Sequence, residues 1–159
     1  MEEDVMFAVD PSEEGGASQD AVETGTEKYL LFLSDGLLFG AKAEYVVEII
    51  TNHVITPLPL VPAYIRGIIN LRGQIIPIVD IRQLLGQPNQ RDNCIMILNI
   101  NETQVGILVD NVQRMIDIDK SALLPAPKQG GQRLVSGMCS LADGQTMLVF
   151  DCLRLLEQA

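Results

Sequence analysis

Apolar residues along this chain come in short blocks that are separated by one to four polar or turn-forming residues. One separator is the Asp-Gly pair inside "KYLLFLSDGLLFGA" (28–41), and two apolar blocks joined by Asp-Gly are typical of a β-hairpin. Another is Leu-Arg-Gly-Gln, which divides "GIINLRGQIIPIVD" (67–80). The stretch between them, "YVVEIITNHVI" (45–55), is rich in β-branched residues. These patterns predict a chain made mainly of short strands.

Two short helices are expected where the apolar pattern changes. Asp80 precedes "IRQLL" (81–85), and Gly86 follows it. Asp is a favoured helix N-cap and Gly a favoured residue just after a helix. Asp151 stands in the same relation to "CLRLLEQ" (152–158). The sequence therefore predicts two capped helices at matching points.

The matching points belong to an internal repeat. Residues 30–50 align with 95–116, and residues 67–85 align with 137–156, at offsets that drift only from 66 to 71. A unit of about 60 residues is too small to bury a good core alone, so the two copies should pack on each other. We predict a mainly β fold of two pseudo-symmetric five-stranded barrels on a shared aliphatic core. The expected bounds are about 28–88 for the first barrel, about 89–150 for the second and about 151–158 for a C-terminal helix.

Charge is concentrated at one end of the chain. The net charge is −10, but residues 1–27 hold nine of the 21 acidic residues and no Lys or Arg. We expect this acidic tail, 1–27, to be disordered and the domain to span 28–159. That domain has 12 acids against 11 bases, so it offers no basic field for nucleic acid. No apolar run reaches the roughly 18 residues of a membrane span, so direct membrane insertion is not expected.

Residues for catalysis or metal binding are not grouped in this sequence. His53 is the single histidine, so neither a metal cluster nor a nucleophile activated by a histidine base is expected near the cysteines. Cys94, Cys139 and Cys152 each lie in an apolar stretch, which indicates buried thiols in a reducing, cytoplasmic compartment. We predict no enzyme activity, no cofactor and no metal.

The repeat offers an internal control for function. Features that both copies share are expected to build the fold, whereas features of one copy are candidates for function. Arg72 aligns with Ala142-Asp143 in the second copy, and Glu48 aligns with Arg114. In "VVEII" (46–50) apolar residues occupy both alternating positions, so some of them should reach the surface. An apolar strip beside a fixed charge is typical of a partner-binding surface.

These residues resemble the CheW family of chemotaxis coupling proteins. The likeness covers about residues 28–157, and "YIRGIINLRGQIIPIVD" (64–80) is its most specific stretch. The resemblance implies two SH3-like barrels and a non-catalytic adaptor in two-component signal transduction. It also implies that Arg72 and Glu48 support a groove that receives the chemoreceptor. The receptor-binding residues implied in this way are Val46, Glu48, Ile49, Asn70, Leu71, Arg72 and Gly73.

The same resemblance implies two protein partners. One is the cytoplasmic signalling tip of transmembrane chemoreceptors, and the other is the regulatory domain of the chemotaxis histidine kinase. The protein would then lie in the cytoplasm at membrane-associated receptor arrays.

Three other readings of the sequence are open. The chain could be a coupler in a non-flagellar chemosensory pathway that controls surface motility or gene expression. It could be the CheW-like module of a coupling protein with a receiver domain, or of the kinase itself, although 159 residues are expected to be too few for a further domain. A small barrel that binds an oligonucleotide or a small ligand would need stacking aromatics and a basic groove, and aromatics are only 4% of the chain.

Overall fold

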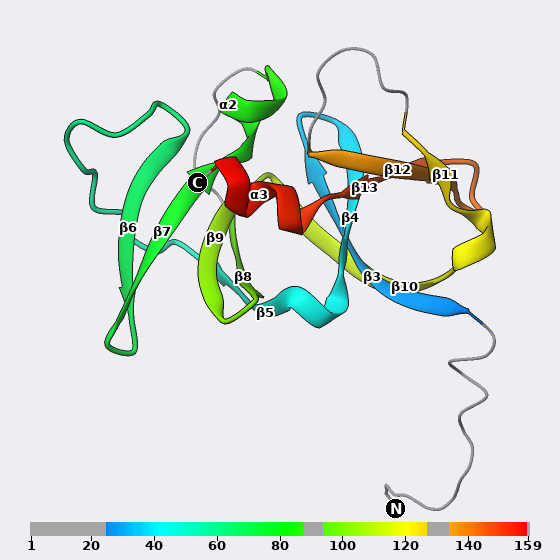
Figure 1. Cartoon of the computed structure of the whole chain (residues 1–159), viewed down its shortest axis with the longest axis horizontal. Coiled ribbons are helices and arrows are strands. Elements are labelled where there is room, and N and C mark those ends of the chain that lie inside the picture. The colour runs from blue at the N-terminus through cyan, green and yellow to red at the C-terminus, as the bar shows by residue number, and fades with distance from the viewer. Residues whose placement is uncertain (1–24, 88–93, 127–133, 159) are drawn as a thin grey trace, which may run out of the picture.

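The computed structural model describes residues 25–87, 94–126 and 134–158. They form two β-sheets that lie side by side, with helix α3 across their junction (Figure 1). The five-stranded sheet, called here the Arg72 barrel, has the strand order β5-β8-β9-β7-β6. Its strands are β5 (Val46–Thr51), β6 (Ile65–Leu71), β7 (Gln74–Asp80), β8 (Cys94–Ile100) and β9 (Thr103–Val109).

The six-stranded sheet, called here the Arg114 barrel, has the order β10-β3-β4-β13-β12-β11. Its strands are β3 (Thr26–Ser34), β4 (Leu37–Lys42), β10 (Asn111–Asp119), β11 (Leu124–Pro125), β12 (Val135–Ser140) and β13 (Thr146–Phe150). The helices are η1 (Ala43–Tyr45), α2 (Ile81–Leu85), η2 (Lys120–Ala122) and α3 (Cys152–Gln158). The predicted fold class, two small barrels with short helices, is confirmed, but the Arg114 barrel has six strands instead of the predicted five because the two-residue strand β11 is added at its edge.

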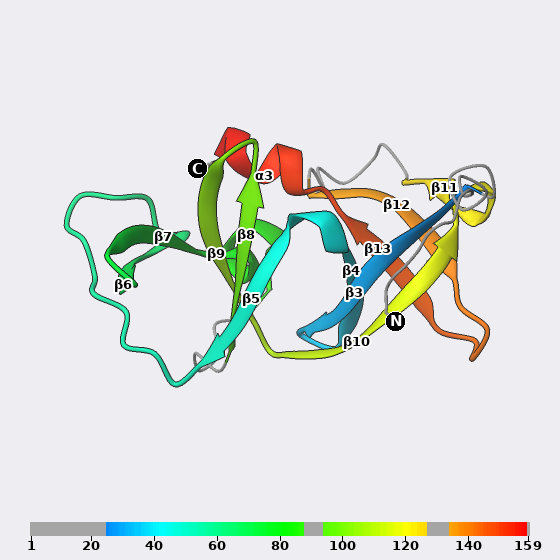
Figure 2. The same ribbon diagram turned by 90° about the horizontal axis from the view of Figure 1, so that it is seen from below.

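The two barrels are not consecutive halves of the chain, so the predicted division near residues 88 and 89 is wrong. The hairpin β3–β4 belongs to the first repeat, yet it pairs with β10 and β13 of the second. The hairpin β8–β9 of the second repeat pairs in turn with β5 and β7 of the first. Figure 2 shows β3 beside β10, and β8 beside β5. The exchange is not visible in the sequence, because the two hairpins have similar apolar patterns and the pattern does not say which strands each will contact.

The repeat itself is visible in the strand register. Gly40 lies opposite Val149 where β4 and β13 run parallel, and Gly106 lies opposite Ile78 where β9 and β7 run parallel. Aligned residues therefore occupy matching places in the two barrels, which confirms their pseudo-symmetry.

Three apolar clusters hold the barrels together. The largest lies between the two sheets and takes side chains from both, including Phe32, Phe39, Met96, Ile107 and Phe150. Each barrel also has an interior cluster of its own. Along β8, Ile95 and Ile97 face the Arg72 barrel interior while Met96 and Leu98 face the shared core. Because both faces of β8 are buried, its sequence is apolar without alternation.

The element ends follow the sequence closely. Asp80 accepts a hydrogen bond from the backbone N–H of Arg82 at 3.0 Å, and Gly86 ends α2 with φ 75°. Asp151 accepts from the backbone N–H of Arg154 at 3.1 Å beside α3. Strand β3 already begins at Thr26, so the first strand of the domain starts slightly before the predicted residue 28. The rest of the predicted tail, residues 1–24, lies outside the described residues.

Candidate partner-binding site

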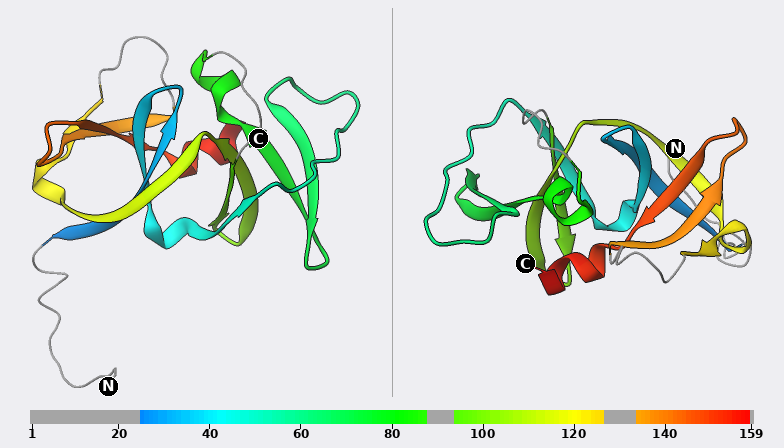
Figure 3. Two further views of the ribbon diagram at one scale, coloured as in Figure 1. Left: turned by 180° about the vertical axis from the view of Figure 1, so that it is seen from behind. Right: turned by 90° about the horizontal axis from the view of Figure 1, so that it is seen from above.

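The tip of the β6–β7 hairpin fixes the position of Arg72. Leu71 pairs with Gln74, so Arg72 and Gly73 are the two turn residues. Both have positive φ, 52° and 85°, as a type I′ turn requires. Asn70 Oδ1 accepts a hydrogen bond from the backbone N–H of Gly73 at 3.1 Å. The turn is thus closed from within, and it projects from the end of the molecule (Figure 3).

Arg72 forms an ion pair with Glu48 on the edge strand β5. The Glu48 side chain is 28% exposed and the Arg72 side chain 68% exposed. Strand β5 has a register shift between Val46 and Glu48, and a bulge of this kind redirects the following side chains. The two charges that distinguish the first repeat are therefore paired with each other, and the pair ties the hairpin tip to the sheet edge.

Exposed apolar residues flank the two members of this pair along the chain. Val47 and Ile49 on β5 and Ile75 at the start of β7 are exposed. The expectation that part of "VVEII" reaches the surface is confirmed. Val46 packs instead on the shared core, and Leu71 packs on the Arg72 barrel interior. Of the seven predicted site residues, Ile49, Asn70, Arg72 and Gly73 are exposed, while Val46, Glu48 and Leu71 are partly buried.

The Arg114 barrel contains the same ion pair with its charges reversed. Arg114 on β10 lies 4.0 Å from Asp143 in the turn between β12 and β13. The pair Glu48–Arg72 places the acid on the edge strand, whereas Arg114–Asp143 places the base there. The charges of the first repeat are therefore distinctive in their sign, not in the presence of a pair.

Two further features had no clear signal in the sequence. The segment between β5 and β6 extends beyond the sheet (Figure 1) and exposes Val54, Leu58 and Leu60. Its three prolines favoured an extended connection but did not predict how far it projects. The other feature is Arg82, which is 1% exposed and lies 2.9 Å from Asp80 and 3.7 Å from Asp110. Arg82 lies in a helix of five residues, and the sequence of that helix gave no reason to expect a buried arginine side chain.

All three cysteines are free and buried. Burial raises the pKa of the Cys94 thiol, and burial with the nearby Asp151 raises the pKa of Cys152 to about 12. A raised thiol pKa disfavours the thiolate that nucleophilic catalysis needs. No three metal-ligating side chains come together within the described ranges, and no helix there is long and apolar enough to cross a membrane.

Comparisons with known proteins agree with this architecture. The model of the CheW-like domain family matches residues 28–159. The chemotaxis protein CheW of Klebsiella aerogenes is 29% identical over 146 residues, 88% of this chain and 87% of that protein. Protein FrzA of Myxococcus xanthus is 26% identical over 107 residues, 65% of this chain and 67% of FrzA. The crystal structure of the scaffolding protein TtCheW from Thermoanaerobacter tengcongensis superposes with a TM-score of 0.73 at 30% identity, covering 78% of this chain and 88% of that one.

Proposed function

The chain belongs to the CheW-like domain family, and from this premise we propose that it couples chemoreceptors to a histidine autokinase without catalysing a reaction. Its partners are the cytoplasmic signalling tip of the receptors and the regulatory domain of the kinase. It works in the cytoplasm, at membrane-associated receptor arrays.

The observation that carries the proposal is the rigid Arg72 turn beside exposed apolar residues. The receptor tip docks on the face formed by β5 and the β6–β7 turn, which comprises Val46, Glu48, Ile49, Asn70, Leu71, Arg72 and Gly73. The ion pair with Glu48 holds the guanidinium in place before binding. A preorganised side chain loses less conformational entropy on binding, and arginine is frequent among residues that dominate interface energies.

Calorimetric titration with each partner tests this proposal. The protein is titrated with a receptor signalling-tip fragment and, separately, with the isolated regulatory domain of the kinase. Arg72→Ala is expected to weaken receptor binding about 30-fold or more, since truncation of a hot-spot arginine costs about 2 kcal/mol or more. Its matched control is Arg114→Ala, which removes the arginine of the corresponding ion pair in the other barrel. Equal losses in both variants, or no binding by the wild type, would contradict the proposal.

A coupler in a pathway other than flagellar chemotaxis is the second candidate. The observation that supports this second candidate is the similarity to FrzA, a relative that is not named as a chemotaxis protein. Both candidates predict binding to receptor and kinase fragments, so binding measurements do not distinguish them. Deletion of the gene does distinguish them. Loss of swimming behaviour supports the first candidate, whereas altered surface motility or gene expression with normal swimming supports the second.

A further inference from the structure

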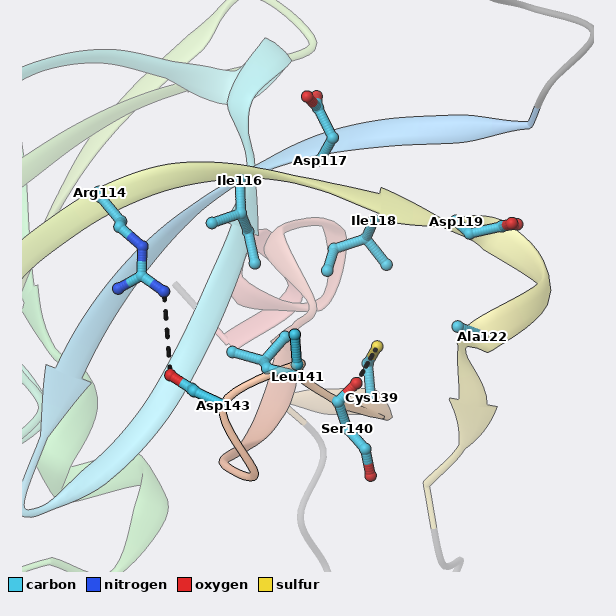
Figure 4. Close-up of a pocket in the computed structure, with 11 residues that line it drawn as sticks. Arg114, Ile116, Asp117, Ile118, Asp119, Ala122, Cys139, Ser140, Leu141 and Asp143 are labelled. Carbon is cyan, nitrogen blue, oxygen red and sulfur yellow. Dashed lines mark hydrogen bonds and ion pairs between the residues drawn. The ribbon is translucent and has the colours of Figure 1, made fainter.

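A groove opens along one edge of the Arg114 barrel, away from the proposed receptor face. It lies between the edge strand β10 and the end of β12, and its volume is about 420 Å³. Ile116 and Ile118 point from β10 into the groove toward Leu141 (Figure 4). The Arg114–Asp143 ion pair crosses one end of it. A volume of this size is within the usual range of binding pockets, roughly 300–1,000 Å³.

Strand edges line this groove on both sides. β10 ends the sheet order, so its outer edge has no strand partner among the described residues. On the opposite side, β11 pairs only with Gly137 and Met138 of β12, which leaves Cys139 and Ser140 beyond its reach. Unpaired strand edges offer backbone N–H and C=O groups to an added extended segment.

The alternation along β10 defines the side chains that such a segment should have. Ile116 and Ile118 face the groove, whereas Asp117 and Asp119 lie between and after them on the opposite face. Residues directly opposite each other on neighbouring strands interact, and opposite charges are favourable there. A complementary strand would therefore place apolar residues beside the isoleucines and basic residues beside the aspartates.

Strand β3, which pairs with the other edge of β10, already places a basic residue opposite one of these aspartates. Lys28 of β3 is directly opposite Asp117 in the register, and its Nζ lies 3.0 Å from Asp117 Oδ1. Both side chains are more than half exposed, and exposed pairs of this kind are worth at most about 1 kcal/mol. Asp117 can therefore accept a second basic neighbour on its free side.

We propose that the outer edge of β10 binds an extended peptide segment of a partner protein in which apolar and basic residues alternate. The apolar side chains fill the groove against Ile116, Ile118 and Leu141. The basic side chains lie on the outer face beside Asp117 and Asp119. This site is separate from the Arg72 face, and the inference does not rest on the proposed receptor binding.

Titration followed by NMR tests the site with two synthetic peptides. One is a capped six-residue peptide of alternating valine and lysine, and the other has glutamate in place of each lysine. The lysine peptide is expected to shift the amide signals of β10 and of Cys139–Leu141, and to bind about three- to tenfold more tightly than the glutamate peptide. Absence of shifts at these amides, or equal binding of the two peptides, overturns the proposal.

A charge-swapped variant tests the outer face specifically. Lys28→Asp combined with Asp117→Lys keeps an opposite-charge pair across β3 and β10, so the fold is expected to persist. It should lower or reverse the preference for the lysine peptide. Glu44→Lys, an exposed change on η1 outside the groove, is the control and should keep the preference. The amide spectrum checks that the swapped variant is folded. If its preference for the lysine peptide is unchanged, Asp117 does not recognise the basic side chains of the peptide, and the proposal is overturned.

Discussion

The Arg72 barrel and the Arg114 barrel solve the same structural problem with opposite charges. In each, an edge strand is tied to a hairpin turn by one ion pair, Glu48–Arg72 in the first and Arg114–Asp143 in the second. The common requirement is a link between the edge strand and the turn, and either polarity meets it. The difference in sign gives the two barrels different charges at matching places on their surfaces.

The two helices that end the repeats differ in burial instead of charge. In α2, Arg82 and its partner Asp80 are both 1% exposed. In α3, Arg154 lies 3.5 Å from Asp151, and its side chain is more than half exposed. Each helix thus carries an Asp–Arg pair, with the arginine two residues after the aspartate in α2 and three residues after it in α3, and the pair is buried in one repeat and exposed in the other. Variants that break each pair can show how much this difference in burial matters.

The largest expected effect is the loss of the buried arginine. Arg82→Met keeps much of the side-chain volume but leaves Asp80 buried, with Arg66 at 3.6 Å as its remaining ion-pair partner. Removing one member of a buried pair commonly costs about 3–5 kcal/mol. Urea unfolding should show a decrease in the free energy of unfolding near this size. Arg154→Met, which breaks the exposed pair in α3, should cost less than about 1 kcal/mol. Similar losses in the two variants would contradict the contrast.

Alkaline pH should destabilise the Arg114 barrel through Tyr29. Burial, assisted by Glu27, raises the pKa of Tyr29 to about 12. The folded state favours the protonated phenol, so its contribution is complete below pH 10 and is lost as the pH rises toward 12. The loss from this one group is on the order of 2 kcal/mol. Tyr29→Phe should flatten the decline in unfolding free energy over this range, and an unchanged slope would contradict the assignment.

The equivalent glycines Gly40 and Gly106 should tolerate alanine differently. A Cβ at Gly106 would lie 2.6 Å from Ile78 Cδ1 and 2.9 Å from Ile95 Cγ2, both in a packed interior. A Cβ at Gly40 would meet only the flexible side chain of Met147. Gly106→Ala is expected to cost about 1–3 kcal/mol, as overpacked cores do. Gly40→Ala should cost less, and the reverse order in thermal unfolding would refute this explanation.

The smallest effect on stability is expected from the two surface pairs. Arg72→Ala and Arg114→Ala each break one exposed pair, so each should lower the free energy of unfolding by less than about 1 kcal/mol. Urea unfolding of both variants checks this. A decrease of several kcal/mol in the free energy of unfolding of either variant would show that its ion pair stabilises the fold. A change in binding by that variant could then result from partial unfolding.

Local chemistry made the elements predictable from the sequence. The Asp-Gly turn, the caps at Asp80 and Asp151 and the position of Arg72 in a turn all depend on a few neighbouring residues. The pattern of apolar residues also predicted the exposed part of β5 and the buried cysteines.

Long-range pairing accounts for what the sequence did not reveal. The exchange of hairpins between repeats depends on which of two similar surfaces a hairpin contacts. The burial of Arg82 depends on Asp110, which follows β9 and is distant in sequence. The ion pair between Arg114 and Asp143 joins β10 to a turn beyond β12. An alignment of the two repeats shows the sign of each charge but not which charges meet in space, so the sequence did not predict this pair.

The most direct measurement for the central claim is receptor-tip binding by a variant with the Arg72 pair reversed. Glu48→Arg combined with Arg72→Glu gives the Arg72 barrel the charge order of the Arg114 barrel, so an ion pair can still form. We predict normal unfolding free energy and receptor-tip binding weakened at least about tenfold, because the charge facing the partner has changed sign. Wild-type affinity in this variant would show that the pair only closes the barrel, and would contradict the account.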